Sequence, residues 1–406
     1  MNTKQQIFLD SFIAKPIAYL FNILARIFGQ ILSINHNLDG ALKSIAVCKF
    51  KGMGSILQAT PMLAAIKKQH PNATLIFVST KSNLAILEKI DSIDQIITID
   101  DSSLFRFFIS NIKSIIQLIK IRPEVYFDLE IYSDFSTLFT LFTLSVNRVG
   151  FYLRSSSFRM GIYTHMMFFN PRVPISSVYL HLTELIGCDT ENLGLYPLAN
   201  EITKPHKHEN KYLVVNPNSS DLRLERRWDK NNFIELIRKL INDYQEYEVL
   251  LIGSKNERDY TQEIVNEIDN KRVINTAGKT SIEEVIGIIN NSTLMITNDT
   301  GPMHLSFCLE TPTICLFGPC SPEQYGMGKS AHIIYKKTYC SPCVHDFEIA
   351  PCNGNNICMQ LIEVSEVYEK ASQLLTSTDS EIKIVDTSKV VYNSEETILG
   401  IVDRLR

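Results

Sequence analysis

The stretch Asn298–Leu305 (NDTGPMHL) gathers an acid, a hydroxyl, a glycine, a proline and a histidine at the end of an apolar run. Proline suits the first turn of a helix, so Pro302 predicts a helix that begins directly after a strand. The free N–H groups at a helix start attract anions, and Gly301 lets an anion approach the backbone closely. A capped helix without a ligand would not require Asp299 and His304 together, so we predict a functional anion site at this corner.

A second polar stretch also follows an expected strand. The segment NPNSS (216–220) leads into RLERRW (223–228), which places Ser219 and Ser220 near three arginines. Hydroxyl and guanidinium groups at a strand end favour phosphate binding. A solvated basic loop is the alternative interpretation.

The third stretch is KFKGMGSILQATP (49–61), where Gly52 and Gly54 stand between an expected strand and a helix. Two glycines permit a tight turn and the close approach of a substrate. The spacing is neither that of a dinucleotide-binding turn nor that of a P-loop. A plain helix-entry turn is the alternative.

Four of the nine cysteines cluster, at Cys340, Cys343, Cys352 and Cys358. Four thiols within such a short segment can hold a structural Zn²⁺ ion, and an Fe–S cluster is also chemically possible. The spacing departs from two regular CxxC pairs, so disulfide or redox-sensitive pairs and plain thiols stay open as alternatives.

The elements that position these stretches alternate between short β-branched runs and helical periodicity, which is typical of parallel sheets with crossover helices. Two such series predict two doubly wound α/β domains that face each other across a cleft. The expected strands are 45–50, 75–79, 95–99, 125–129, 212–216, 248–252, 272–274, 294–297 and 313–317. The expected helices are 57–69, 104–120, 231–244, 257–268, 281–290 and 303–309.

The resulting division of the chain has five parts. The sequence predicts an amphipathic helix in 1–39, a first α/β domain in 40–190, a polar linker in 191–211, a second α/β domain in 212–372 and an unassigned tail in 373–406. Within 17–34, Asn22, Arg26 and Gln30 form a narrow polar stripe on an otherwise apolar helix. This pattern favours a helix in a membrane interface over one packed on its own domain or one spanning a membrane.

Composition limits the function classes. The chain of 406 residues is 45% hydrophobic and 21% charged, which is typical of globular proteins, and its net charge of −4 argues against nucleic-acid binding. We find no pattern of a secretory signal, so a reducing cytoplasmic setting is expected.

Together, the turn with Ala59-Thr60-Pro61, the segment NRVGF (147–151), the arginine–tryptophan loop and NDTGPMHL followed by LFGP (316–319) resemble glycosyltransferase family 9, the ADP-heptose:lipopolysaccharide heptosyltransferases. The similarity covers most of 40–372. It implies a GT-B fold, a nucleoside diphosphate sugar bound by the second domain, an acceptor saccharide bound by the first, and inversion without a metal ion.

The resemblance also implies residue roles. Asp299 would face the donor sugar, with His304 supporting the site. The other expected substrate contacts are Gly54, Ser55, Ser219, Ser220, Arg226, Glu257, Ile282, Thr300 and Gly301, of which Thr300 and Gly301 would hold the diphosphate through their amides.

One position departs from the family pattern. The family has an aspartate, its proposed general base, where this chain has Ser55, and an unactivated hydroxyl cannot take a proton near neutral pH. Asp128 and Glu130, which end the fourth expected strand, are the next candidates for a catalytic base. We expect Glu130 to act as the base, and Asp128 to brace the strand end.

The sequence therefore predicts an inverting transferase that moves a heptose-like sugar to a lipopolysaccharide-core or related membrane-linked saccharide, at the cytoplasmic face of the inner membrane. A catalytically silent sugar-nucleotide-binding protein, or another GT-B enzyme such as a sugar-nucleotide epimerase, is the alternative.

Overall fold

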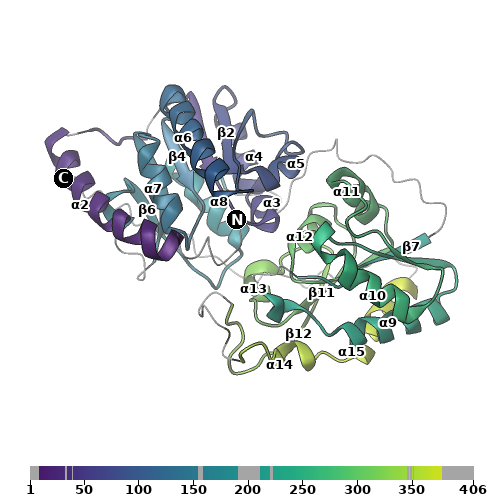
Figure 1. The fold of residues 1–406 in the computed structure, drawn as a ribbon. Coiled ribbons are helices and arrows are strands. Elements are labelled where there is room, and N and C mark those ends of the chain that lie inside the picture. The colour runs from purple at the N-terminus through teal and green to yellow at the C-terminus, as the bar shows by residue number, and fades with distance from the viewer. Residues whose placement is uncertain are drawn as a thin grey trace. The chain divides into compact units, whose positions relative to one another are not determined.

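The computed structural model describes residues 9–32, 34–38, 40–153, 159–190, 211–219, 223–344, 347, 350 and 352–376. Ser220, nearly all of the predicted linker 191–211 and most of the predicted tail 373–406 lie outside these residues. The chain forms two compact units, each built around its own sheet (Figure 1). Unit 1 holds the first six strands and unit 2 holds the last six.

Unit 1 contains a six-stranded, fully parallel sheet with the order β3-β2-β1-β4-β5-β6. Its strands are β1 (Ser44–Cys48), β2 (Thr74–Thr80), β3 (Gln95–Ile99), β4 (Val125–Asp128), β5 (Asn147–Tyr152) and β6 (His165–Phe168). Its main helices are α3 (Met53–Gln58), α4 (Thr60–Gln69), α5 (Leu84–Leu87), α6 (Leu104–Ile121), α7 (Asp134–Phe142) and α8 (Ile175–His181).

Right-handed crossovers place α6 and α7 on the same face of this sheet, because both lead toward β4 and β5 in the same direction. Both helices bury apolar side chains against β1, β2 and β4. Phe107 of α6 contacts Phe135 of α7, with 5.2 Å between ring centroids. The two helices therefore form one continuous layer over this face.

Unit 2 repeats the plan with the strand order β12-β11-β10-β7-β8-β9, again fully parallel. Its strands are β7 (Lys211–Asn216), β8 (Tyr247–Leu251), β9 (Val273–Asn275), β10 (Leu294–Asn298), β11 (Thr313–Phe317) and β12 (Ala331–Tyr335). Its helices are α9 (Lys230–Asp243), α10 (Arg258–Ile268), α11 (Ile282–Asn290), α12 (Gly301–Cys308), α13 (Pro322–Tyr325), α14 (Ile357–Gln360) and α15 (Val364–Thr376).

Each sheet has a point at which the strand order reverses. In unit 1 it lies between β1 and β4, and in unit 2 it lies between β7 and β10. Ligands of doubly wound sheets bind outside the carboxyl ends of the strands at such a point. The segments that follow these four strands are therefore the places to look for function.

The N-terminal helix α2 (Lys15–Leu32) follows a π-helical turn at Leu9–Ala14. Buried Ala14 and Ala18 pack against α7 residues, and Phe21 contacts Phe142 of α7 at 5.2 Å between ring centroids. By length and composition α2 could cross a membrane.

Part of the polar stripe on α2 lies against unit 1. Asn22 is buried, and a side chain at Gly161 would collide with both Asn22 and Arg26. Asn22, Ala14 and Ala18 face the protein because only short side chains fit that close approach. The apolar side, with Leu20 57% and Ile23 57% exposed, faces outward.

The predicted fold class of two doubly wound α/β domains is confirmed, with strand boundaries within about two residues of the expected ones. Three strands were missed: β5, β6 and β12. The predicted helix 57–69 is two helices, α3 and α4, which meet at Ala59.

Candidate functional site

The opening motif forms the corner between β10 and α12. Thr300 stands at the N-cap, but its side chain makes no capping hydrogen bond. Its hydroxyl instead accepts a hydrogen bond from Asn216 Nδ2 at 2.8 Å and donates to Asn298 O at 3.3 Å. The first N–H groups of α12 are therefore not satisfied by the residue that usually caps them, which suits an anion.

Asparagine side chains tie the segments at this edge together. Asn298 Oδ1 accepts from Trp228 N at 3.1 Å, and Asn298 Nδ2 donates to Asn218 O at 3.0 Å. Asn218 Nδ2 donates to Ile252 O at 2.9 Å. The ends of β7, β8 and β10 are thus fixed to the arginine–tryptophan loop, and buried Trp228 holds that loop in the core.

Arg226 and Asp299 meet at this edge, with 3.5 Å between Arg226 Nη1 and Asp299 Oδ2. Both Arg226 Nε and Asp299 Oδ2 are buried without a hydrogen-bond partner. Burial opposes the charge of Arg226, but buried Cys320 and Asp299 outweigh it and raise the pKa of Arg226. A charged pair with unused hydrogen-bonding atoms is incomplete, and a polar ligand can complete it.

His304 lies on the first turn of α12 and is 5% exposed. Burial lowers the pKa of His304 to about 4, with Asp299 opposing this shift and Arg226 adding to it. The imidazole is therefore neutral near pH 7 and serves as a hydrogen-bonding group rather than a charge.

The remaining expected substrate contacts in unit 2 differ in their surroundings. Ser219 is 1% exposed, and its hydroxyl has no hydrogen-bond partner. Glu257 accepts from Ser254 N at 2.7 Å in a capping box, so part of its carboxylate already has a local task. Ile282 begins α11 next to the N-cap Ser281. No observation assigns Glu257 or Ile282 to a ligand, so these two roles stay predictions.

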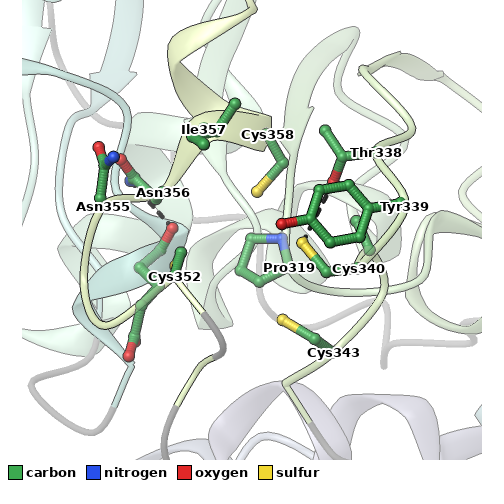
Figure 2. A pocket seen from close by; sticks show the side chains of 12 residues that line it. Pro319, Thr338, Tyr339, Cys340, Cys343, Cys352, Asn355, Asn356, Ile357 and Cys358 are labelled. Atoms are coloured by element: carbon green, nitrogen blue, oxygen red, sulfur yellow. Dashed lines mark hydrogen bonds between the residues drawn. The ribbon is translucent and has the colours of Figure 1, made fainter.

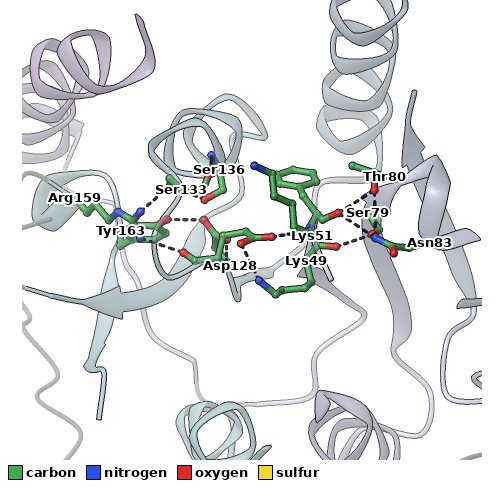
Figure 3. Close-up of polar contacts among 12 residues, drawn as sticks. Lys49, Lys51, Ser79, Thr80, Asn83, Asp128, Ser133, Ser136, Arg159 and Tyr163 are labelled. Atoms are coloured by element: carbon green, nitrogen blue, oxygen red, sulfur yellow. Dashed lines mark hydrogen bonds and ion pairs between the residues drawn. The ribbon is translucent and has the colours of Figure 1, made fainter. Parts of the chain in front are cut away.

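In unit 1, Glu130 is bound on every side. Its Oε2 lies 2.8 Å from Lys49 Nζ, and its Oε1 accepts from Phe50 N at 2.8 Å and from Lys51 N at 3.0 Å (Figure 3). Burial opposes ionisation of Glu130, but Lys49 and these N–H groups outweigh it and hold its pKa below the usual value. The carboxylate is therefore ionised and paired.

Asp128 is fully buried and braces the same edge. Its Oδ1 accepts from Glu130 N at 2.9 Å, and its Oδ2 accepts from Tyr163 Oη at 2.6 Å and Thr140 Oγ1 at 3.2 Å. Arg159 donates to Glu130 O at 3.1 Å from the same side (Figure 3). These contacts hold the Asp128 carboxylate in place at the end of β4.

Ser55 and Gly54 lie in α3, which starts after Gly52 with a φ of 86°. Only glycine adopts such a backbone without strain, so the turn needs Gly52. Tyr179 and Ser55 share a hydrogen bond, and burial raises the pKa of Tyr179 to about 12. Tyr179 and the pairing of Lys49 with Glu130 were missed, because these partners are remote in sequence.

The four clustered cysteines line one cavity of about 340 Å³ (Figure 2). Burial is the main cause that raises the pKa of Cys343, with Cys340 and Cys352 adding to the shift. Among the residues that the structure describes, no three His, Cys, Asp or Glu side chains are placed to hold a metal ion as they stand. Asn356, in the same segment, donates to the carbonyls of Glu225 and Arg227 at 3.0 and 2.8 Å.

The chain resembles known proteins in both sequence and fold. Residues 182–352 match the model of glycosyltransferase family 9 (heptosyltransferase). Lipooligosaccharide heptosyltransferase 2 of Campylobacter jejuni is 30% identical over 176 residues, which cover 41% of this chain and 52% of that protein. The chain thus spans about half the length of that relative.

Solved structures show the fold over a longer range. The structure of E. coli ADP-heptose lipopolysaccharide heptosyltransferase II aligns with a TM-score of 0.66 at 18% identity, over 82% of this chain and 98% of that one. An iron-containing dodecameric glycosyltransferase of enterotoxigenic E. coli aligns with a TM-score of 0.53 at 13% identity, over 82% and 76%. Residues 182–352 therefore resemble glycosyltransferase family 9, and the chain has the GT-B fold of these solved structures.

Proposed function

We propose that the chain is a glycosyltransferase that moves a heptose-like sugar from a nucleoside diphosphate donor to a lipopolysaccharide-core or related saccharide. The observation that carries this proposal is the incomplete Arg226–Asp299 pair beside the uncapped start of α12. Its place at the switch point of a parallel sheet fits a nucleotide ligand. The heptosyltransferase relatives favour a heptose over other sugars.

The donor binds to unit 2 in this proposal. The backbone N–H groups of Thr300 and Gly301 and the guanidinium of Arg226 hold the diphosphate, with the hydroxyl of Ser219 beside them. Asp299 faces the sugar. As the bond between the anomeric carbon and phosphate oxygen breaks, charge builds on the diphosphate, and these donors stabilise it more than they stabilise the bound substrate.

The acceptor and the base belong to unit 1. The acceptor hydroxyl attacks the anomeric carbon from the side opposite the leaving diphosphate, and its proton passes to Glu130, so the configuration inverts. Lys49 keeps Glu130 ionised until then. Gly54 and Ser55 line the acceptor side. This chemistry uses no metal ion.

The exposed apolar side of α2 supports a peripheral position on a membrane. A helix that packs one side on its own protein and leaves the other apolar can lie in the headgroup region. We place the protein at the cytoplasmic face of the inner membrane, where a lipid-linked acceptor would be made.

The clustered cysteines support a structural metal, Zn²⁺ or iron. Soft thiolates suit both, and all four cysteines line one cavity. A metal would have to draw the thiols inward, which would also fix Asn356 and the loop that carries Arg226. Elemental analysis of protein purified under reducing conditions tests this. At least 0.5 Zn or Fe per chain, lost in Cys343→Ser, is expected, and metal-free protein contradicts it.

The direct test of function is release of nucleoside diphosphate from ADP-, UDP-, GDP- and CDP-sugars, with and without a lipid-linked core saccharide. Transfer predicts release only with acceptor present, and a product of inverted anomeric configuration by NMR. Turnover of a donor with no acceptor would indicate an epimerase. Binding of a donor without turnover in any acceptor extract would indicate a silent binding protein.

A further inference from the structure

Helix α6 of unit 1 is apolar on the side that faces outward as well as on the side that packs on the sheet. The centre of its outward side is apolar, with Phe105 (76% exposed), Phe108 (55%), Ile112 (58%) and Ile116 (47%). Its inward side buries Asn111, whose Nδ2 donates to Phe107 O at 2.7 Å. The outward side of a surface helix in a soluble protein normally carries charged and polar residues.

The charges of α6 are all of one sign and lie in one row. Arg106, Lys113 and Lys120 are spaced by seven residues, so they lie along one edge of the apolar side, and all three are exposed. The helix contains no Asp or Glu. Within the described part of the chain, no carboxylate forms an ion pair with Lys113 or Lys120. A basic row beside an apolar strip extends for about 21 Å along the helix.

Helix α6 belongs to the same layer of helices as α2. Helix α7 lies between the two, contacting α6 through Phe135 and Phe107 and contacting α2 through Phe142 and Phe21. Figure 1 shows α6, α7 and α2 along the same side of the unit 1 sheet. Two helices of one layer therefore each leave an apolar side uncovered.

We infer that the outward side of α6 docks on a bilayer surface that carries anionic lipid headgroups. Apolar side chains enter the boundary between headgroups and acyl chains, while the basic row stays at the level of the phosphates. Charge complementarity favours lipid over a second copy of this chain, because α6 of a second copy would bring the same basic residues and no Asp or Glu to pair with them. A bilayer with anionic headgroups takes up the apolar side chains at its acyl boundary and pairs its phosphates with the basic row.

The test is co-sedimentation of the full chain with vesicles of neutral phosphatidylcholine and with vesicles containing 30% phosphatidylglycerol. No sugar nucleotide is added, so the result does not depend on the proposed transferase activity. Ile112→Glu should lower the partition coefficient for anionic vesicles at least ten-fold. Leu361→Glu, at a site of unit 2 that is 49% exposed, is the matched control and should leave it unchanged.

The charge row has its own variant. Lys113→Gln combined with Lys120→Gln should lower binding to anionic vesicles about thirty-fold, since each basic residue near such a surface adds about 1 kcal/mol. Binding to neutral vesicles should stay the same. Equal loss in Ile112→Glu and Leu361→Glu, or no loss in any variant, overturns the inference. A change from oligomer to monomer in the α6 variants, without a change in vesicle binding, would assign the strip to a second copy and also overturns it.

Discussion

The two switch points share one topology but differ in how far their polar groups are satisfied. In unit 1, Glu130 and Asp128 receive hydrogen bonds or a charge on each carboxylate oxygen. In unit 2, Arg226 and Asp299 keep buried atoms without hydrogen bonds, next to a helix start without a side-chain cap. A satisfied network fixes geometry, whereas an incomplete one gains free energy when a ligand arrives.

The largest expected effect concerns unit 1. Glu130→Gln should lower the transfer rate about a thousand-fold, within the usual range for a general base. The same change leaves Lys49 buried without its counter-charge and should destabilise unit 1 by about 3–5 kcal/mol. Steady-state kinetics and urea unfolding measure the two effects.

The double variant Lys49→Met, Glu130→Gln separates stability from chemistry. Removing both charges should restore most of the stability but not the rate. If transfer survives in Glu130→Gln, or returns with stability in the double variant, Glu130 is not the base.

The next effect concerns unit 2. Arg226→Gln should lower kcat about 10²–10³-fold, because it removes a charged donor from the leaving diphosphate. Arg223→Gln is the control in the same loop, since its guanidinium donates to Phe347 O at 3.0 Å and does not reach Asp299. Similar losses in both variants would assign the effect to the loop rather than to Arg226.

The pH dependence of stability distinguishes the two sites. His304 has a folded pKa of about 4, below its unfolded value, so the unfolded state binds more protons and stability falls as pH drops below about 6.5. Between pH 7 and pH 5 this should cost about 2 kcal/mol. Glu130, whose folded pKa is lowered, loses its contribution only at more acidic pH.

Urea unfolding of the parent and of His304→Gln at pH 7 and pH 5 tests this assignment. The variant should lose about 2 kcal/mol less than the parent over that interval. An equal loss in both proteins would show that another group causes it.

The smallest effect is expected at the position that departs from the family pattern. Ser55→Ala should lower transfer by less than about three-fold, since Ser55 contributes one hydrogen bond, to Tyr179. Kinetics at saturating donor measure this. A loss as large as that of Glu130→Gln would return the catalytic role to Ser55.

The sequence predicted the unit 2 corner because its chemistry is contiguous: Asp299, Thr300 and Gly301 follow one strand and begin one helix. The two parallel sheets could be predicted because short β-branched runs alternate with segments of helical periodicity. The strands β5, β6 and β12 could not: β5 begins with Asn147 and Arg148 and contains Gly150, β6 has only four residues, and β12 follows Gly326 and Gly328.

Contacts between residues far apart in the sequence could not be predicted. Lys49 and Glu130 are 81 residues apart, and nothing in their neighbours indicates the pair. The orientation of α2 depends on Gly161, which alone admits Asn22 and Arg26. The outward apolar side of α6 was likewise hidden, because a periodic pattern does not say which side the sheet covers.

The most direct test is isothermal titration of the sugar nucleotide that gives the largest thermal stabilisation, into the parent, Arg226→Gln and the double variant Lys49→Met, Glu130→Gln. If the incomplete site of unit 2 binds the donor, the parent and the unit 1 variant should bind with similar Kd, and Arg226→Gln should bind at least ten-fold more weakly. Absence of binding by any nucleoside diphosphate sugar, or equal weakening in both variants, would contradict the account.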